Sequence, residues 1–172
     1  MNEESIMTFE IRELTEMDRA WVKRVVEAEW GGSIVVSRGL VHEPGSLPGL
    51  IALYGDRPVG LVTFNIVDQS CELVTLNSFK EGIGIGASLV DSVVSKAKEE
   101  GCLRLWLITT NDNTRALRFY QKIGFRLIAL HRGAVEESRK MKPTIPITGL
   151  DGIPIRDELE LEIRFGIQRS ET

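Results

Sequence analysis

Residues 73–100 read LVTLNSFKEGIGIGASLVDSVVSKAKEE, and the rest of the chain can be placed around this stretch. An apolar run at residues 73–76 leads into a turn with Gly82, Gly84 and Gly86, and an amphipathic helical pattern begins directly behind it. Glycines let the backbone bend tightly and let a ligand approach the amides closely. A helix start offers free N–H groups and partial positive charge, so this order of elements is typical of a phosphate or pyrophosphate site.

Two other interpretations of the glycines stay open at this point. A glycine cluster before a helix is often only a tight loop, and Gly82, Gly84 and Ala87 also satisfy the G-x-G-x-x-[G/A] pattern of a dinucleotide-binding fold. A dinucleotide enzyme would need an acidic residue about 20 residues beyond the glycines, at the end of the next strand. That distance falls at residues 103–107, which contain none.

A second stretch, residues 105–125, reads LWLITTNDNTRALRFYQKIGF. With the first stretch it resembles the GNAT superfamily of N-acetyltransferases, which has a Q/R-x-x-G-x-G/A turn after the fourth strand and N-x-x-A-x-x-x-Y-x-x-x-G-F after the fifth. Residues 81–86 read EGIGIG, and the second motif matches at every defined position from Asn113 to Phe125. Glu81 stands where the family has Gln or Arg, and Lys80 precedes it.

The resemblance implies an α/β fold with a mixed, mostly antiparallel seven-stranded sheet flanked by helices, in the order β-α-β-β-β-α-β-α-β-β. A chain of 172 residues is the size of one domain, so we expect residues 1–172 to form a single domain with a long loop and a final strand at 133–167. In this family the fourth and fifth strands splay apart and the cofactor arm lies in the gap.

The same resemblance implies a site for acetyl-CoA as cosubstrate. Its pyrophosphate would be held by backbone at the glycine turn and its arm by the backbone of the fourth strand. The residues that the resemblance assigns to the cofactor are Gly82, Ile83, Gly84, Ile85, Gly86 and Ala87 at the turn, Val74, Thr75 and Leu76 on the strand, and Asn113.

Acyl transfer from a thioester to an amine needs a neutral amine, a stabilised oxyanion and a proton for the departing thiolate. The resemblance assigns that last proton to Tyr120, since a phenol of pKa ~10 stays protonated at pH 7; the alternative is a core aromatic. An aliphatic amine of pKa ~10.4 is mostly cationic at pH 7, so a base must collect its proton.

Glu72 is the candidate base, because it shares a face of the strand with Val74 and Leu76 in a regular alternation, from which some relatives present a carboxylate. It could equally be a solvated residue. Other relatives use a glutamate at the end of the fifth strand, where this chain has Ile108. His42 could also act as a base, although a lone histidine next to a Pro–Gly turn is more often a surface or packing residue.

Composition limits the partners. A net charge of −4 argues against nucleic acid, and no apolar run approaches the ~20 residues of a membrane span. The acidic N-terminus has no signal-peptide pattern, so we expect a cytoplasmic protein with Cys71 and Cys102 as buried thiols. The histidines show no metal-ligand spacing, and we expect no metal. The expected partner is the amine of a small molecule or peptide; a homodimer and a non-catalytic acyl-CoA sensor stay open.

The patterns along the chain indicate where the elements lie. Strands are predicted at residues 9–14, 47–54, 58–67, 71–79, 103–108, 127–130 and 158–167. Helices are predicted from the cap formed by Thr15 and Asp18 to Gly31, at residues 84–100, and behind Asn113, whose side chain would cap its helix. Residues 33–43 could be a strand or a helical turn, and residues 133–157 are expected to form a loop.

Charged residues near the C-terminal end allow two interpretations. One face of the last strand carries Glu158, Glu160, Glu162 and Arg164, after Asp157, and the loop before it carries Arg139, Lys140 and Lys142. They could be a solvated strand face and a basic surface loop. In the family this region borders the acceptor side, so the carboxylates could instead attract a cationic amine while the basic loop receives an acidic group of the same small molecule.

Overall fold

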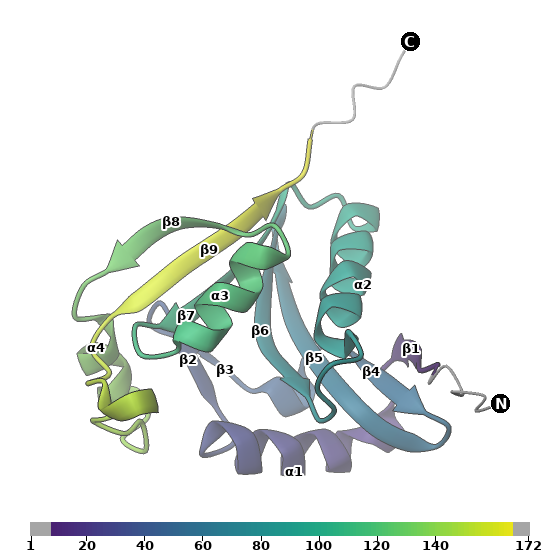
Figure 1. Ribbon diagram of the computed structural model, residues 1–172, viewed down its shortest axis with the longest axis horizontal. Helices are drawn as coiled ribbons and strands as arrows, with labels where there is room; N and C mark the ends of the chain where they lie inside the picture. The colour runs from purple at the N-terminus through teal and green to yellow at the C-terminus, as the bar shows by residue number, and fades with distance from the viewer. Residues whose placement is uncertain (1–7, 167–172) are drawn as a thin grey trace, which may run out of the picture.

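The computed structural model describes residues 8–166 and contains a seven-stranded sheet, as predicted (Figure 1). All neighbouring strands are antiparallel except β6 and β7. In spatial order the strands are β1 (Glu10–Glu13), β4 (Gly49–Tyr54), β5 (Arg57–Val67), β6 (Ser70–Ser78), β7 (Arg104–Thr110), β9 (Glu158–Arg164) and β8 (Arg126–His131). The last strand in sequence therefore lies inside the sheet, between β7 and β8.

Helices cover both faces of this sheet. They are α1 (Arg19–Trp30), α2 (Ile85–Glu99), α3 (Thr114–Lys122) and α4 (Ala134–Met141). The larger core lies under α2 and α3 and includes Leu89, Val93 and Leu105, while α1 buries Val22 and Val26 against Leu61 on the other face. A strand with apolar residues on both sides is expected in a sheet covered on both faces.

The local signals at helix ends work as predicted. The Asp18 carboxylate accepts a hydrogen bond from the Thr15 backbone at 2.7 Å, ahead of α1, and Gly31 ends α1 in a left-handed conformation. Cys71 and Cys102 are buried free thiols, and burial raises the pKa of Cys71 to about 12.

Two regions differ from the prediction or complete it. Residues 33–43 form a small antiparallel hairpin of β2 (Val35–Ser37) and β3 (Leu40–His42). Residues 133–157 are not one loop, because they begin with α4. This helix was missed because its eight residues bury only Val135 and Ser138, which is too little for a readable apolar period. Arg139 of α4 donates to the carbonyls of Pro146 and Ile155, which holds the following segment against the helix.

Strand β6 contains a β-bulge at Val74, close to the point where β6 and β7 part. Thr63 pairs with Thr75 and Phe64 pairs with Leu73, so Val74 is an extra residue on β6. The parallel pairing of β6 with β7 covers Ser70–Glu72, and the two strands part beyond it. The bulge also reverses which face each later residue occupies. The expectation that Glu72 and Leu76 share a face is therefore wrong: Leu76 packs against the core under α2.

Candidate functional site

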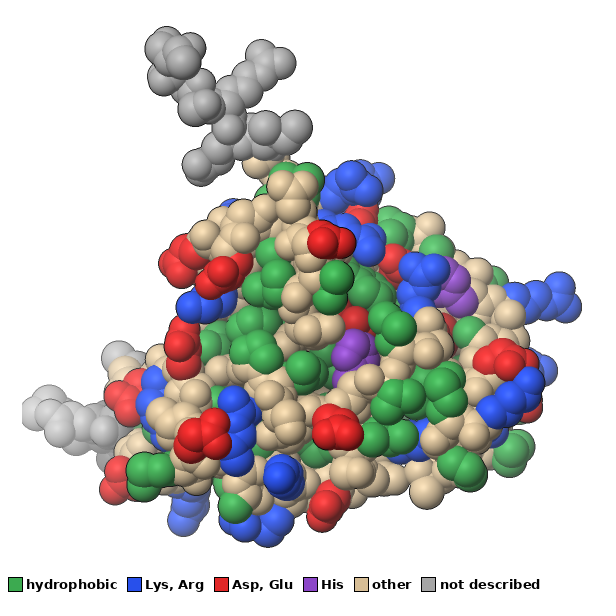
Figure 2. Space-filling model, turned by 180° about the vertical axis from the view of Figure 1, so that it is seen from behind, with side chains coloured by type: hydrophobic (Ala, Val, Ile, Leu, Met, Phe, Trp, Pro, Cys, Tyr) green, Lys and Arg blue, Asp and Glu red, His purple; other side chains and the backbone are tan. Residues whose placement is uncertain are grey.

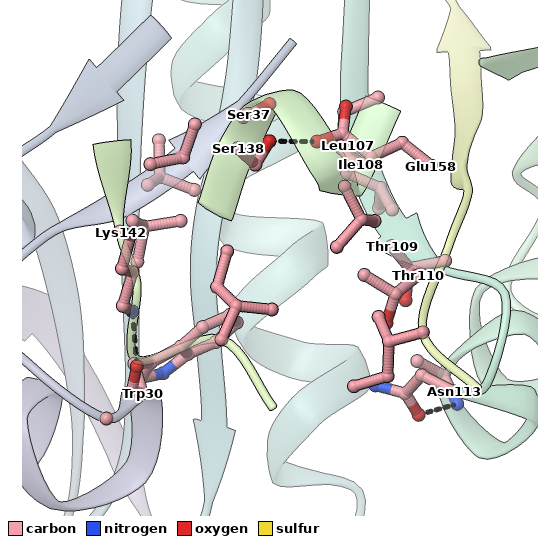
Figure 3. A pocket seen from close by; sticks show the side chains of 18 of the residues that line it. Trp30, Ser37, Leu107, Ile108, Thr109, Thr110, Asn113, Ser138, Lys142 and Glu158 are labelled. Carbon is pink, nitrogen blue, oxygen red and sulfur yellow. Dashed lines mark hydrogen bonds between the residues drawn. The ribbon is translucent and has the colours of Figure 1, made fainter. Parts of the chain in front are cut away.

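A cavity of about 620 Å³ lies where β6 and β7 part (Figure 3). Its walls come from β6, β7 and α3 on one side and from the end of α1, β2, α4 and the segment after α4 on the other. Among the residues that line it are Glu72, Val74, Leu76, Asn113 and Tyr120, which the sequence also singled out. Five of the twelve predicted site residues thus surround one space.

The glycine turn stands at the start of α2. Gly82 and Gly84 both have φ of +80°, and an added Cβ at either would meet no described atom within 4 Å. No side chain in the described range caps the first amides of α2. These amides therefore have an open approach for an anion. Ile83 is half-buried and Ile85 is buried in the core, so at Ile85 the backbone rather than the side chain is available.

Gly86 has a different reason to be glycine. A Cβ at this position would lie 3.2 Å from Cζ of Phe119 on α3, which is tighter than ordinary van der Waals contact. Its small size lets α2 pack closely against α3. A role for Gly86 or Ala87 toward the cofactor stays a prediction.

The strand edge beside the cavity is the predicted place for the cofactor arm. Val74 and Leu76 line the cavity, whereas the Thr75 side chain is fully buried and its hydroxyl lies 2.7 Å from that of Thr63. The backbone of β6 beyond Glu72 faces the gap instead of β7. Its N–H and C=O groups can bond an extended ligand as a neighbouring strand would.

Three polar residues after β7 each have a structural partner. Asn111 accepts from the backbone of Arg156 and Asp157, and Asp112 accepts from the backbone of Leu150. Asn113 caps α3 by accepting from the Ala116 backbone at 3.1 Å (Figure 3). The capping prediction is confirmed, and a contact of Asn113 with the cofactor stays a prediction.

Tyr120 lines the cavity from α3. Its ring is held edge-to-face by Phe119 and Phe125, with centroids 5.1 Å and 5.3 Å away. In the part of the chain that the structure describes, its hydroxyl has no hydrogen-bond partner. Burial raises the pKa of Tyr120 above its ordinary value, so the hydroxyl stays protonated and available to donate.

Glu72 and His42 form a close buried pair on the opposite face of the sheet from Tyr120. Oε2 of Glu72 lies 3.1 Å from Nε2 of His42, at an angle that does not make a hydrogen bond. Both side chains are about 95% buried. His42 is therefore neither on the surface nor alone, and Glu72 is not a solvated carboxylate. Chain separation hid this pair, because His42 is on β3 and Glu72 is on β6.

The acidic face of β9 is buried, which corrects the solvated-face interpretation. Glu158, Glu160 and Glu162 are 2%, 3% and 7% exposed. Glu158 accepts from Ser138 and from the Arg38 backbone, Glu160 contacts Arg38, Arg104 and His131, and Glu162 contacts Arg104 and Arg164. The residues are covered because β9 lies inside the sheet, beneath α4 and the β2–β3 turn.

The prediction that Arg139, Lys140 and Lys142 form a basic surface loop is also wrong. Arg139 binds backbone carbonyls, and Lys142 is 8% exposed and donates to the Trp30 carbonyl (Figure 3). Of the three basic residues, Lys140 is exposed, and it pairs with Glu137 one turn earlier on α4. Arg139 therefore holds the segment after α4 against the helix, and Lys142 ties it to the end of α1, so the two do not form a basic surface.

Within residues 8–166, no cluster of three His, Cys, Asp or Glu side chains could hold a metal ion. No helix in the same range has the length and apolar character needed to cross a bilayer.

Comparisons with known proteins follow this geometry. The model of the family described as "Acetyltransferase (GNAT) family" matches residues 6–125. The uncharacterized protein YxbD of Bacillus subtilis (strain 168) is 40% identical over 141 residues, which are 81% of this chain and 89% of YxbD.

Two solved structures share the fold. A Bacillus subtilis acetyltransferase in complex with CoA is 21% identical with a TM-score of 0.64, over 92% of this chain and 98% of that one. Arabidopsis thaliana Naa50, in complex with the bisubstrate analogue CoA-Ac-MVNAL, is 17% identical with a TM-score of 0.67, over 91% and 99%.

Proposed function

The chain belongs to the GNAT family of acetyltransferases, and from this premise we propose that it transfers the acetyl group of acetyl-CoA to a primary amine, by direct attack in a ternary complex. The observation that carries the proposal is the parting of β6 and β7 at the Val74 bulge. It opens one cavity to both faces of the sheet, with Tyr120 on one face and Glu72 on the other. A donor and an acceptor can therefore meet in the gap.

The residues at the gap fit acetyl-CoA. The left-handed Gly82 and Gly84, with open space beside them, and the amides at the start of α2 suit a pyrophosphate. The exposed backbone edge of β6 suits the amide-rich arm. The bound thioester would supply an activated acetyl group. Related folds solved with CoA or with a CoA-peptide analogue support this assignment.

In this proposal Glu72 accepts the proton of the incoming ammonium group. An amine of pKa ~10.4 must lose a proton before it can attack, and a buried carboxylate at the cavity wall is placed to take it. Nε2 of His42 on the hairpin lies 3.1 Å from Oε2 of this carboxylate. Glu72 would take the role of the glutamate that other relatives have where this chain has Ile108.

Tyr120 would donate the proton that the departing thiolate needs. Its raised pKa keeps the phenol neutral, and the aromatic contacts of Phe119 and Phe125 fix the ring direction. A thiol of pKa ~8.5 is a stronger acid than this phenol, so the hydroxyl stabilises the departing thiolate by donating a hydrogen bond, and any proton that it transfers is regained from solvent. A proton donor must reach the substrate, and the Tyr120 hydroxyl lines the cavity without a protein partner among the described residues.

The test combines binding and turnover. Calorimetry with acetyl-CoA and with NAD separates an acyl-CoA site from a dinucleotide site, and thiol release with a panel of amines measures transfer. We expect Glu72→Gln to lower kcat/KM for the amine about a hundredfold at pH 7. The deficit should shrink at pH 9, because the neutral fraction of the amine rises about a hundredfold between these values.

Glu137→Gln is the matched control, since that carboxylate is exposed on α4 and should leave turnover unchanged at both pH values. A Glu72→Gln deficit that does not depend on pH would contradict the base assignment. Tight acetyl-CoA binding without transfer to any amine would favour the acyl-CoA sensor over an enzyme.

A further inference from the structure

The acceptor side of the cavity has a fixed roof. Thr144, Ile145 and Pro146 line the cavity from the segment after α4. This segment is tied to the end of α1 at two points: Nζ of Lys142 donates to the Trp30 carbonyl, and Oγ of Thr144 donates to the Gly31 carbonyl at 2.9 Å. In Figure 3 the Lys142 side chain runs along one wall toward Trp30, with Thr110 and Asn113 at the opposite wall.

The roof narrows this half-open cavity, which is called the chamber below. A polypeptide acceptor needs a channel that is open along its length, whereas here residues 142–146 cross the space above β6 and β7. The volume of about 620 Å³ must also hold the reactive end of the cofactor, which leaves room for a small molecule.

The charges of the chamber select against a carboxylate on the acceptor. Of the described residues that line it, three are carboxylates, namely Glu29, Glu72 and Glu158, and one is a cation, Lys142. Lys142 already donates to Trp30, and burial lowers its pKa. Arg139 is occupied by backbone carbonyls. An acidic group in the chamber would be buried without a matched partner, which is costly.

Much of the remaining lining is apolar, and one buried hydroxyl in it also lacks a partner. Val35, Val74, Ile108, Val135 and Ile155 supply apolar surface. Oγ of Ser37 lines the same space and is buried without a partner in the described part of the chain. Leaving a buried hydroxyl unpaired is unfavourable, so a bound molecule that bonds Ser37 would remove that cost.

We infer that the acceptor is a small primary amine with an apolar body and no carboxylate, and that the chamber excludes polypeptide N-termini and side chains. The inference rests on the proposed acetyl transfer and narrows its acceptor class. It replaces the zwitterionic acceptor that the sequence suggested, because the cations of that interpretation are engaged in the structure.

The test uses three acceptors that share one side chain: phenethylamine, phenylalanine, and a tetrapeptide that begins with phenylalanine. With acetyl-CoA as donor, we expect kcat/KM for phenethylamine to exceed that for either of the others at least about tenfold. Preferred turnover of the peptide or the amino acid, or turnover of none of the three by a protein that binds acetyl-CoA, overturns the inference. A protein that fails to bind acetyl-CoA overturns the proposed function instead.

Variants of the roof give a second readout. Lys142→Met combined with Thr144→Ala should reduce the preference for phenethylamine over the peptide by about tenfold, because it releases both ties to α1. Lys140→Met is the matched control two residues before Lys142, in the last turn of α4, since Lys140 is exposed and pairs only with Glu137 among the described residues. If the double variant does not fold, Thr144→Ala alone tests the same point with a smaller shift. An unchanged preference in the folded roof variant contradicts the role of the roof in excluding the peptide.

Discussion

Two halves of the molecule meet at the gap, and they are built in different ways. The turn half comprises β6, residues 79–84, α2 and α3; the hairpin half comprises the end of α1, β2, β3, α4 and β9. The turn half offers backbone amides at positions close in sequence. The hairpin half is held by side chains that join distant residues, such as Arg38 with Glu160, 122 residues apart, and Lys142 with Trp30, 112 residues apart. Under the proposed function, binding of the cosubstrate would rest on backbone and selection of the acceptor would rest on side chains.

Figure 2 shows the face of the hairpin half, with hydrophobic side chains at its centre and charged ones mostly toward the rim. Exposed apolar residues on this half include Leu40 and Val41 of β3. The carboxylates of β9 are buried beneath this surface. Substitutions in the hairpin half should therefore leave acetyl-CoA affinity unchanged, and substitutions in the turn half should leave the choice of acceptor unchanged.

The largest effect is expected at the turn half. Gly84→Val should weaken acetyl-CoA binding by about a hundredfold or more, because its side chain enters the space beside the α2 amides. The left-handed conformation adds a folding cost of about 1–2 kcal/mol. Calorimetry measures binding, and thermal unfolding checks the fold.

Gly101→Val is the matched control, since Gly101 lies at the other end of α2 with φ of +76° and open space beside it. It carries the same strain without entering the site. Equal acetyl-CoA affinity in the two variants would remove the turn from the binding site.

Tyr120→Phe should lower kcat about a hundredfold while acetyl-CoA affinity stays within about twofold, because it deletes a proton donor and little contact area. Steady-state kinetics and calorimetry on the same preparation separate the two effects. Tyr54→Phe, at an exposed position at the end of β4, should change neither. Wild-type turnover in Tyr120→Phe would mean that another group protonates the thiolate.

In the hairpin half, Glu160→Gln should lower the free energy of unfolding by about 2–3 kcal/mol, because it leaves Arg38, Arg104 and His131 without their shared carboxylate. Urea unfolding measures the change, and acetyl-CoA affinity should not move. Glu137→Gln, which breaks an exposed pair, should cost about 0.5 kcal/mol or less. Equal losses of stability in the two variants would show that the buried contacts of Glu160 stabilise the fold no more than the exposed pair of Glu137 does.

The smallest expected effect is on the loss of folding stability at low pH. Burial alone would raise the pKa of Glu162, but hydrogen bonds from Arg164 and Arg104 outweigh it and lower the pKa. A lowered carboxyl pKa gives stability that is present above the unfolded pKa and is lost as pH falls through the folded one. Glu162→Gln should therefore lose less stability than wild type as the pH falls from 7 to 3. An identical loss would exclude Glu162 from the acid response.

The sequence predicted the turn half because its signals are local. The apolar spacing of α2, the glycine turn and the Asn113 cap each depend on neighbours within a few residues, and the structure has all three. The order of the seven sheet strands along the chain followed from the same patterns and from the family resemblance, whereas their spatial order was not predicted. The spacing of the glycines did not show that Gly86 must also be small because it packs against Phe119.

The hairpin half could not be predicted in the same way. Alternation correctly placed three glutamates on one face of β9, but it could not show that Arg38, Arg104 and α4 cover that face. A single extra residue at Val74 reversed the alternation of β6, and the sequence carries no glycine or proline there to indicate it. His42 and Glu72 meet only because the small hairpin folds over the sheet.

The place of β9 has a consequence for synthesis on the ribosome. Strand β8 has β9 as its sheet neighbour, and β9 begins at Glu158, 27 positions after the end of β8 at His131. As the chain emerges from its N-terminus, strands β1 and β4 to β6 and helix α2 can assemble first. The polypeptide must then hold β8 without its partner until Arg164 has left the exit tunnel. The interval is short at roughly 5–20 residues per second, yet it is when Leu127, Ile128 and Leu130 are most open to wrong strand partners.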